Sequence, residues 1–288
     1  MLKNKKIGFI GGGNMAEAII KGLITSRFIE AKNITVSDTT QMRLNFLQKK
    51  HKVLITSDNR KTTAKSDIVI IAVKPETVSK VLNEVGDLAD NKKLFVSVAA
   101  GIHICHMEKS LIGNRGKKVG VVRTMPNTPS LVMEGVTAIS HGTHVSKKEL
   151  QIVHRIFEAI GKTVEVEENQ LDAVTGLSGS GPAYILMVIE ALSDAGVKMG
   201  LPREVSKTLT VQTILGTAKL ALESDKHLSE LKDMITSPGG TTIAGLHTLE
   251  ASGIRASFIN AVETATRRSV ELGRTVDKNM AGESSSDK

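Results

Sequence analysis

A glycine-rich segment near the start of the chain has the spacing of a dinucleotide-binding loop. In GFIGGGNMAEAI (8–19), Gly11, Gly13 and Ala16 fill the pattern G-x-G-x-x-G/A. Gly11 permits a tight turn, Gly13 lets backbone amides approach a pyrophosphate, and Ala16 lets the next helix pack closely on the sheet. The free amides and the dipole at that helix start favour an anion. Because the segment follows an apolar strand pattern and opens a helix pattern, it predicts dinucleotide binding rather than an empty glycine turn.

The end of the second predicted strand carries side chains that favour different cofactors. Asp38 stands where an acid accepts a hydrogen bond from the ribose 2′-hydroxyl of NADH. Thr39, Thr40 and Arg43 follow at once and could instead hold the 2′-phosphate of NADPH. A third interpretation makes Asp38 the N-cap of the helix that starts at Gln41. The sequence therefore predicts NADPH or NADH and leaves the preference open.

Two further strand ends are expected to line the same cleft, AVKP (72–75) and AAGI (99–102). Ligands of open parallel sheets bind outside the carboxyl ends of the strands. Pro75 can occupy the first turn of the next helix, and the small residues of the second segment would let a nicotinamide ring approach the backbone. Turn formation alone is the competing explanation for both segments.

Three segments later in the chain have an unusual composition, MPNTP (125–129), GLSGSGPAY (176–184) and ITSPGGTTIAGLHTLE (235–250). None has the pattern of a metal site, a catalytic triad or a P-loop. In the third, glycines and hydroxyl residues precede a helix: Ser237, Gly239, Gly240, Thr241 and Thr242. Successive N–H groups and hydroxyls at a helix start could hold a small anion such as a carboxylate. A capped turn without a ligand is the alternative.

Alternating strand and helix patterns must position these segments. Strands are predicted at 6–10, 34–37, 53–56, 67–73, 94–99 and 118–123, and helices at 15–26, 41–50, 76–85 and 103–111. This alternation is typical of right-handed crossovers and a doubly wound parallel sheet. Two edge strands, 136–140 and 163–166, are expected with a helix at 147–160 between them. The predicted fold class is α/β, a Rossmann-type sheet followed by an all-α domain.

From about residue 167 the pattern becomes wholly helical. Helices are predicted at 171–175, 183–199, 203–223, 228–236, 241–252 and 254–272. The segment 183–199 is apolar nearly all round and must be covered on all sides, so we expect an obligate homodimer built through these helices. The predicted division is a Rossmann domain at 1–166, a helical dimerisation and substrate domain at 167–275, and a disordered tail at 276–288.

Composition limits the other possibilities. The chain has 288 residues, enough for two domains, and a net charge of +8 from dispersed lysines and arginines. Dispersed charge and an aromatic share of 2% argue against a nucleic-acid partner. The single cysteine, Cys105, excludes an internal disulfide and is expected to be buried. No histidine pair has the companions of a metal site, and no apolar run is long enough for a membrane span, so a cytoplasmic protein is expected.

Three segments together resemble one family. TSPGGTTIAGLHTLE, GLSGSGPAYI and VKMGLPR (197–203) are similar to motifs of pyrroline-5-carboxylate reductase, and the resemblance extends from Ile7 to about Leu272. It implies that Gly11, Gly13, Asn14 and Met15 bind the pyrophosphate and that Asn59 lies near the adenosine ribose. The other cofactor residues that it implies are Ala72, Val73, Lys74, Pro75, Ala99, Ala100 and Gly101, with Met125, Pro126 and Asn127 beside the nicotinamide.

The same resemblance implies the substrate and the assembly. Ser237, Gly240, Thr241 and Thr242 would hold the carboxylate of 1-pyrroline-5-carboxylate, with Thr242 facing the imine nitrogen. The product would be proline, and the protein a homodimer or a decamer of five dimers. Asp38 departs from the small polar or basic groups common in the family. A 3-hydroxyacid dehydrogenase would need a lysine or histidine in 183–197, which has none, and a non-catalytic cofactor-binding relative remains the other alternative.

Overall fold

A computed structural model describes residues 5–112 and 118–283 of the chain. The chain divides into two compact units. The first, which we call the Rossmann unit, comprises Met1–Gly179 and Thr264–Lys288, and the second, the helical unit, comprises Ser180–Glu263. No helix in the described part of the chain is both long and apolar enough to cross a bilayer.

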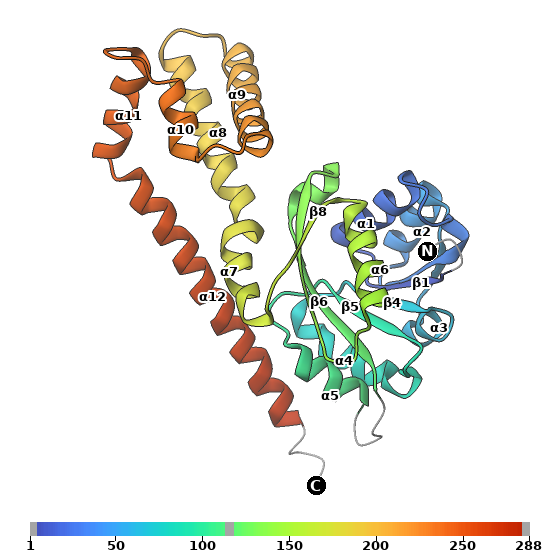
Figure 1. Cartoon of the computed structure of the whole chain (residues 1–288). Helices are drawn as coiled ribbons and strands as arrows, with labels where there is room; N and C mark the ends of the chain where they lie inside the picture. Colours follow the sequence, from blue (N-terminus) through green and yellow to red (C-terminus); the bar gives the residue numbers. More distant parts are fainter. Residues whose placement is uncertain (1–4, 113–117, 284–288) are drawn as a thin grey trace. The chain divides into compact units, whose positions relative to one another are not determined.

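The Rossmann unit is built on one eight-stranded sheet (Figure 1). Its strands are β1 (Ile7–Ile10), β2 (Ile34–Ser37), β3 (Leu54–Thr56), β4 (Ile68–Ile71), β5 (Leu94–Ser97), β6 (Gly120–Pro126), β7 (Gly135–His141) and β8 (Gly161–Glu165). They lie in the order β3-β2-β1-β4-β5-β6-β7-β8. The order reverses between β1 and β4, which is the switch point where doubly wound sheets bind ligands.

Helices cover both faces of this sheet. They are α1 (Asn14–Thr25), α2 (Gln41–His51), α3 (Asn59–Ala64), α4 (Pro75–Val85), α5 (Ile104–Ile112), α6 (Lys147–Glu158) and α7 (Leu171–Val174). Alternate strand residues point to opposite faces, so Val96 joins the apolar core under α1 and α6, whereas Phe95 joins the core under α4 and α5. The near-continuous apolar strands of the sequence are explained by this two-sided burial.

The predicted fold class is confirmed, with three differences in the Rossmann unit. β7 runs antiparallel to β6, so the sheet is mostly rather than wholly parallel. β7 also lies between β6 and β8, so of the two expected edge strands only β8 is at an edge, the other edge being β3. The short helix α3 was not predicted; it begins behind Asp58, whose carboxylate accepts a hydrogen bond from Lys61 N–H at 2.9 Å. Six residues give too short a pattern for helical periodicity to be visible.

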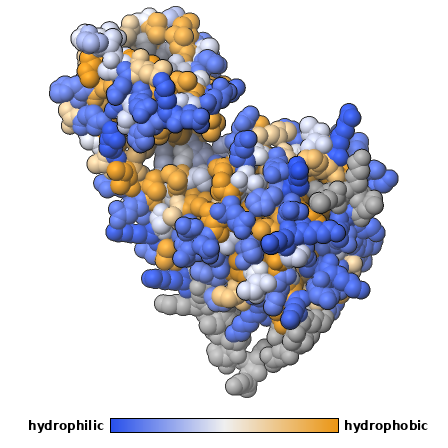
Figure 2. Space-filling model, viewed as in Figure 1, coloured by the Kyte–Doolittle hydropathy of each residue, from blue (hydrophilic) through white to orange (hydrophobic). Residues whose placement is uncertain are grey.

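The helical unit consists of α8 (Gly181–Lys198), α9 (Arg203–Glu223), α10 (Leu228–Met234), α11 (Thr241–Ala251) and the first part of α12 (Ile254–Glu283). A π-helical turn, Thr175–Gly179, precedes α8. Apolar side chains remain on the surface of this unit (Figure 2), including Leu186, Met187 and Leu209, which are 64%, 63% and 55% exposed. The helical unit thus does not bury its apolar residues within one chain.

The end of the chain differs from its prediction. α12 continues to Glu283, so residues 276–283 are helical where a disordered tail was expected, and residues 284–288 lie outside the described part. The polar composition that predicted disorder is also compatible with a continuation of the helix. The boundary expected at residue 166 likewise differs from the compact units, because the second unit begins at Ser180 and α12 returns to the first unit at Thr264.

Candidate active site

The glycine-rich loop between β1 and α1 has the geometry of an anion cradle. Gly11 has a φ of +98°, a conformation that favours glycine, and a Cβ there would collide with the backbone of Ala72. Gly13 is different, because a Cβ at this residue would meet no atom within 4 Å. The space in front of Gly13 adjoins the start of α1, where the first N–H groups have no partner within the helix. A phosphate fits this open space and these donors.

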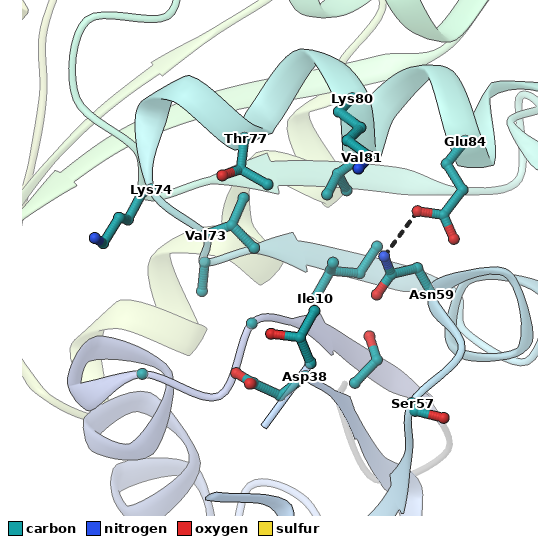
Figure 3. A pocket seen from close by; sticks show the side chains of 15 residues that line it. Ile10, Asp38, Ser57, Asn59, Val73, Lys74, Thr77, Lys80, Val81 and Glu84 are labelled. Carbon is teal, nitrogen blue, oxygen red and sulfur yellow. Dashed lines mark hydrogen bonds between the residues drawn. The ribbon is translucent and has the colours of Figure 1, made fainter. Parts of the chain in front are cut away.

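A pocket of about 590 Å³ opens beside this loop (Figure 3). The carboxyl ends of β1, β2 and β4 converge on it, as the parallel topology requires. Seven predicted cofactor residues line it: Gly11, Gly13, Asp38, Asn59, Ala72, Val73 and Lys74. The pocket has the size and position of a site for a dinucleotide. Asn14, Met15, Arg43 and Pro75 are adjacent in sequence or structure but are not among its lining residues.

One wall of the pocket was not predicted. It is formed by side chains of α4 that point toward the strands on the other side of the pocket (Figure 3), namely Thr77, Lys80, Val81 and Glu84. They recur at intervals of three and four residues, so they share one face of the helix. Asn59 Nδ2 donates a hydrogen bond to Glu84 Oε2 at 2.9 Å, which links α3 to this wall. The spacing on α4 was the signal that could have identified these four residues.

Gly12, the middle glycine of the loop, joins the loop to the end of β2. Its N–H donates a hydrogen bond to Asp38 Oδ2 at 2.7 Å. The other carboxylate oxygen of Asp38 accepts a hydrogen bond from Thr40 N–H at 2.8 Å. The suggestion that Asp38 caps the next helix is wrong, because the N-cap of α2 is Thr40. Asp38 instead fixes the glycine loop, a role that its position in the sequence did not indicate.

Arg43 is held by an acidic residue of α1. Its Nη2 donates to Glu17 Oε2 at 2.6 Å, and its Nε donates to the carbonyl of Gly12. Lys50 Nζ and His51 Nε2 also contact Glu17 Oε1, at 2.9 Å and 3.3 Å. Burial alone would raise the pKa of the Glu17 carboxyl, but hydrogen bonds from Lys50, Arg43 and His51 outweigh burial and lower it to about 2. Glu17 therefore stays ionised at neutral pH and forms ion pairs with Arg43 and Lys50.

The predicted nicotinamide-side residues follow β5 or end β6. They are Ala99, Ala100, Gly101, Met125, Pro126 and Asn127, and none lines the pocket described above. Gly101 has a φ of +76°, and a Cβ there would lie 3.4 Å from the backbone of Gly273 in α12. The backbone of α12 thus passes close to this loop. Because β4, β5 and β6 pair in parallel, both segments lie at the carboxyl ends of the strands, as the pocket does.

Side-chain hydrogen bonds connect the carboxyl ends of these strands to residues that follow the sheet. Asn127 Nδ2 donates to the carbonyl of Ser178 at 3.2 Å, and Asn127 Oδ1 accepts from Val136 N–H at 2.9 Å. Nearby, Glu168 Oε1 accepts from Ile104 N–H at 2.7 Å and from the buried Arg123 Nη1 at 3.2 Å. These bonds order the start of α5 directly after the Ala99–Gly101 loop. Sequence reasoning missed Arg123 and Glu168, which belong to no local motif.

The predicted carboxylate site lies in the helical unit, at the start of α11. Gly240 is the N-cap of this helix, and Thr241 and Thr242 begin its first turn. Gly240 N–H donates to the carbonyl of Ser237 at 3.1 Å, which closes the preceding turn. The first N–H groups of the helix have no intrahelical partner. Ser237, Gly240, Thr241 and Thr242 are thus brought together around a helix start able to receive a small anion.

Other residues considered from the sequence have no such setting. The described residues contain no group of three or more histidine, cysteine or acidic side chains arranged for a metal ion. Cys105 is exposed, so the expectation that it is buried is wrong. The buried residues of α5 are Ile104, Met107 and Leu111, and Cys105 falls on the other side of this helix.

Comparisons with known proteins agree with both halves of this arrangement. Residues 168–272 match the family model "Pyrroline-5-carboxylate reductase dimerisation", and residues 6–101 match "NADP oxidoreductase coenzyme F420-dependent". A pyrroline-5-carboxylate reductase of Methanosarcina acetivorans is 46% identical over 95% of this chain and 100% of its own length. The solved structure of a pyrroline-5-carboxylate reductase from Coxiella burnetii is 38% identical, covers 94% of this chain and 99% of that one, and has a TM-score of 0.87. A Plasmodium falciparum pyrroline carboxylate reductase with NADP bound is 35% identical, with 95% and 100% coverage and a TM-score of 0.85. The chain therefore belongs to the pyrroline-5-carboxylate reductase family.

Proposed function

We propose that this chain reduces the C=N bond of 1-pyrroline-5-carboxylate to give L-proline, with NADPH or NADH as the reductant. The observation that carries the proposal is a full-length match to the reductase family in a chain whose dinucleotide loop is intact. The cofactor supplies a hydride to the imine carbon. The residues of the chain must bind the two molecules, orient them and exclude water from the point of transfer.

The pyrophosphate fits the loop and helix start formed by Gly11, Gly13, Asn14 and Met15. The open space at Gly13 supports this assignment, because a side chain there would fill the cradle. We assign the adenosine ribose to the region between Asp38 and Asn59, which both line the pocket. The adjoining wall is formed by Ala72, Val73 and Lys74, and Pro75 follows them at the start of α4.

We assign the nicotinamide to the ends of β5 and β6. Ala99, Ala100 and Gly101 provide a small-residue loop, and Met125, Pro126 and Asn127 provide the neighbouring segment. Asn127 is fixed by two hydrogen bonds, to Val136 and Ser178, which supports a role in shaping this end of the site. A fixed wall favours one orientation of the ring toward the imine carbon.

The carboxylate of the substrate is assigned to the start of α11. The dipole and free N–H groups of Thr241 and Thr242, with the hydroxyl of Ser237 and the turn at Gly240, suit a compact anion. The Thr242 hydroxyl would donate a hydrogen bond near the imine nitrogen. A cyclic imine is basic enough to take its proton from solvent, so the predicted site needs no buried carboxylic acid or histidine.

The dimerisation family model supports an oligomeric protein. We propose a homodimer in which the exposed apolar side chains of α8 and α9 are covered by a second copy. A decamer of five dimers is the larger assembly that the family resemblance implies. The cytoplasmic location expected from the sequence stays a prediction.

An assay of imine-dependent oxidation of the reduced cofactor tests the proposed function directly. In this assay, Thr242→Ala is expected to lower kcat by about ten- to a hundredfold, the scale of one positioned hydrogen bond. Thr248→Ala is a matched control, because its hydroxyl donates within the same helix to the Ala244 carbonyl at 3.2 Å. Wild-type protein without activity would refute the function, whereas an unchanged rate in Thr242→Ala would remove only Thr242 from the mechanism.

A further inference from the structure

Asp38 is fixed at the edge of the pocket and still has capacity to bind a ligand (Figure 3). Each of its oxygens accepts one backbone hydrogen bond, from Gly12 at 2.7 Å and from Thr40 at 2.8 Å. A carboxylate has about four acceptor positions, so two remain. The end of β2 is where the adenosine ribose of a bound dinucleotide lies. Asp38 is therefore a preorganised acceptor for a ribose hydroxyl.

The basic side chains that follow β2 are held by other groups of the protein. Arg43, Lys50 and His51 all contact Glu17, and Arg43 also donates to the carbonyls of Gly12 and Gly13; none of the three lines the pocket. The side chain of Glu17 is only 16% exposed, and its low pKa keeps it charged at neutral pH. Releasing Arg43 toward a ligand would therefore leave part of the Glu17 charge without its partner.

The two cations that do line the pocket come from the other side. Lys74 precedes α4 and Lys80 lies within it, opposite the strand end that carries Asp38 (Figure 3). Glu84 lines the same wall one turn beyond Lys80. The region next to Asp38 therefore presents a carboxylate, hydroxyl groups and backbone groups, with no lining cation from α2 to offset a second negative charge.

We propose that Asp38 determines cofactor specificity in this chain and makes it prefer NADH to NADPH. The 2′-hydroxyl of NADH can donate a hydrogen bond to Asp38. A 2′-phosphate carries about −1.5 to −2 charges near neutral pH and would meet the Asp38 carboxylate as a like charge. The proposal rests on the reductase function above, which requires only that one of the two cofactors be used.

The first test uses the full-length wild-type protein. Titration with NADH and with NADPH, followed by nicotinamide fluorescence in the absence of imine, gives the two Kd values. We expect NADH to bind at least about tenfold more tightly, and kcat/KM with imine present to show the same order. Equal affinity or a preference for NADPH would overturn the proposal and leave the reductase function intact. Binding of neither cofactor would overturn both.

Three variants locate the preference. Asp38→Asn keeps an acceptor for Gly12 N–H and removes the charge, so the ratio of the two Kd values is expected to fall by about tenfold. Glu17→Gln weakens the hold on Arg43 and is expected to improve NADPH binding several-fold with NADH binding little changed. Glu76→Ser removes an exposed charge that does not line the pocket and should leave the ratio unaltered.

The variants also separate specificity from folding. Each is compared with wild type by thermal unfolding, since Asp38 fixes two backbone amides. An Asp38→Asn protein that unfolds like wild type and keeps the wild-type ratio would overturn the proposal. If Asp38→Asn fails to fold, the wild-type titration decides, because equal affinity for the two cofactors or a preference for NADPH overturns the proposal without any variant.

Discussion

The Rossmann unit and the helical unit are both rich in apolar residues, but only the Rossmann unit buries them within one chain. Phe9, Phe95 and Phe157 are fully buried between the sheet and its helices. Among the described residues of the helical unit, Leu231 is the one hydrophobic residue that is buried. Small polar residues such as Ser193 and Ser206 fill the contact between α8 and α9 instead.

The difference shows that hydrophobic patterning specifies which side chains must be covered without specifying what covers them. α8 was recognised from the sequence because most of its circumference is apolar. In the structure that same property leaves Ile185, Leu186, Met187 and Leu192 exposed, from 47% to 64%. A second copy of the chain completes such a surface in an oligomer. Three sets of variants test the contrast between the two units.

The largest effect is expected from a charge in the apolar surface of the helical unit. Leu186→Asp should convert the oligomer to monomers at micromolar concentration and reduce activity at least about a hundredfold, because a buried unpaired carboxylate is costly. Light scattering coupled to size-exclusion chromatography measures the mass. Met42→Asp is the matched control, since Met42 is 79% exposed in the Rossmann unit. A Leu186→Asp protein with the wild-type mass would show that α8 is not in the interface.

A smaller effect is expected from a cavity in the Rossmann unit. Phe157 in α6 is 0% exposed, and Phe157→Ala should lower the free energy of unfolding by about 3–5 kcal/mol. Urea denaturation of the two proteins measures the change, and the oligomeric mass of the folded protein should not alter. Met42→Ala, at a residue of α2 that is 79% exposed, should cost less than about 1 kcal/mol. A loss from Phe157→Ala no larger than that from Met42→Ala would show that the core under α6 does not limit stability.

The smallest effects are expected from one glycine in each unit. A Cβ at Gly22 in α1 would lie 2.5 Å from the carbonyl oxygen of Ala159, so Gly22→Ala should destabilise the protein by about 1–3 kcal/mol. A Cβ at Gly216 in α9 would meet no atom within 4 Å, and Gly216→Ala should stabilise the helix by up to about 1 kcal/mol. Thermal unfolding compares the pair. Destabilisation by Gly216→Ala would reveal a close partner backbone at this residue.

Much of the fold was predictable because burial on two faces leaves a strong local pattern. β2 and α9 have the predicted bounds, and most other elements differ by one to three residues. The antiparallel direction of β7 was not predictable, because a strand pattern has the same alternation in either direction. The length of α12 was missed because its polar end carries no apolar stripe to mark a helix.

The candidate site was predictable where one local motif carries the geometry. The glycine loop and its neighbours Ala72, Val73 and Lys74 line the pocket as expected. The fixed position of Asp38 was not foreseen, since it depends on a bond to Gly12, 26 residues away. Arg123 and Glu168 escaped notice for the same reason, being 45 residues apart in sequence. Hydrogen bonds between residues so far apart in the chain depend on the tertiary structure, and no regular spacing in the sequence predicts them.

The path of α12 has a consequence for how the protein is made. Ser269 Oγ donates a hydrogen bond to Asp172 Oδ1 at 2.6 Å, and Gly273 lies against Gly101, so the Rossmann unit receives contacts from the last part of the chain. On the ribosome, the sheet can form early, but these contacts wait until all of the helical unit has been synthesised. A prematurely terminated product would keep the phosphate-binding loop and lack the helix beside the Gly101 loop. The surroundings of the Gly101 loop are thus completed only after the helical unit has been synthesised.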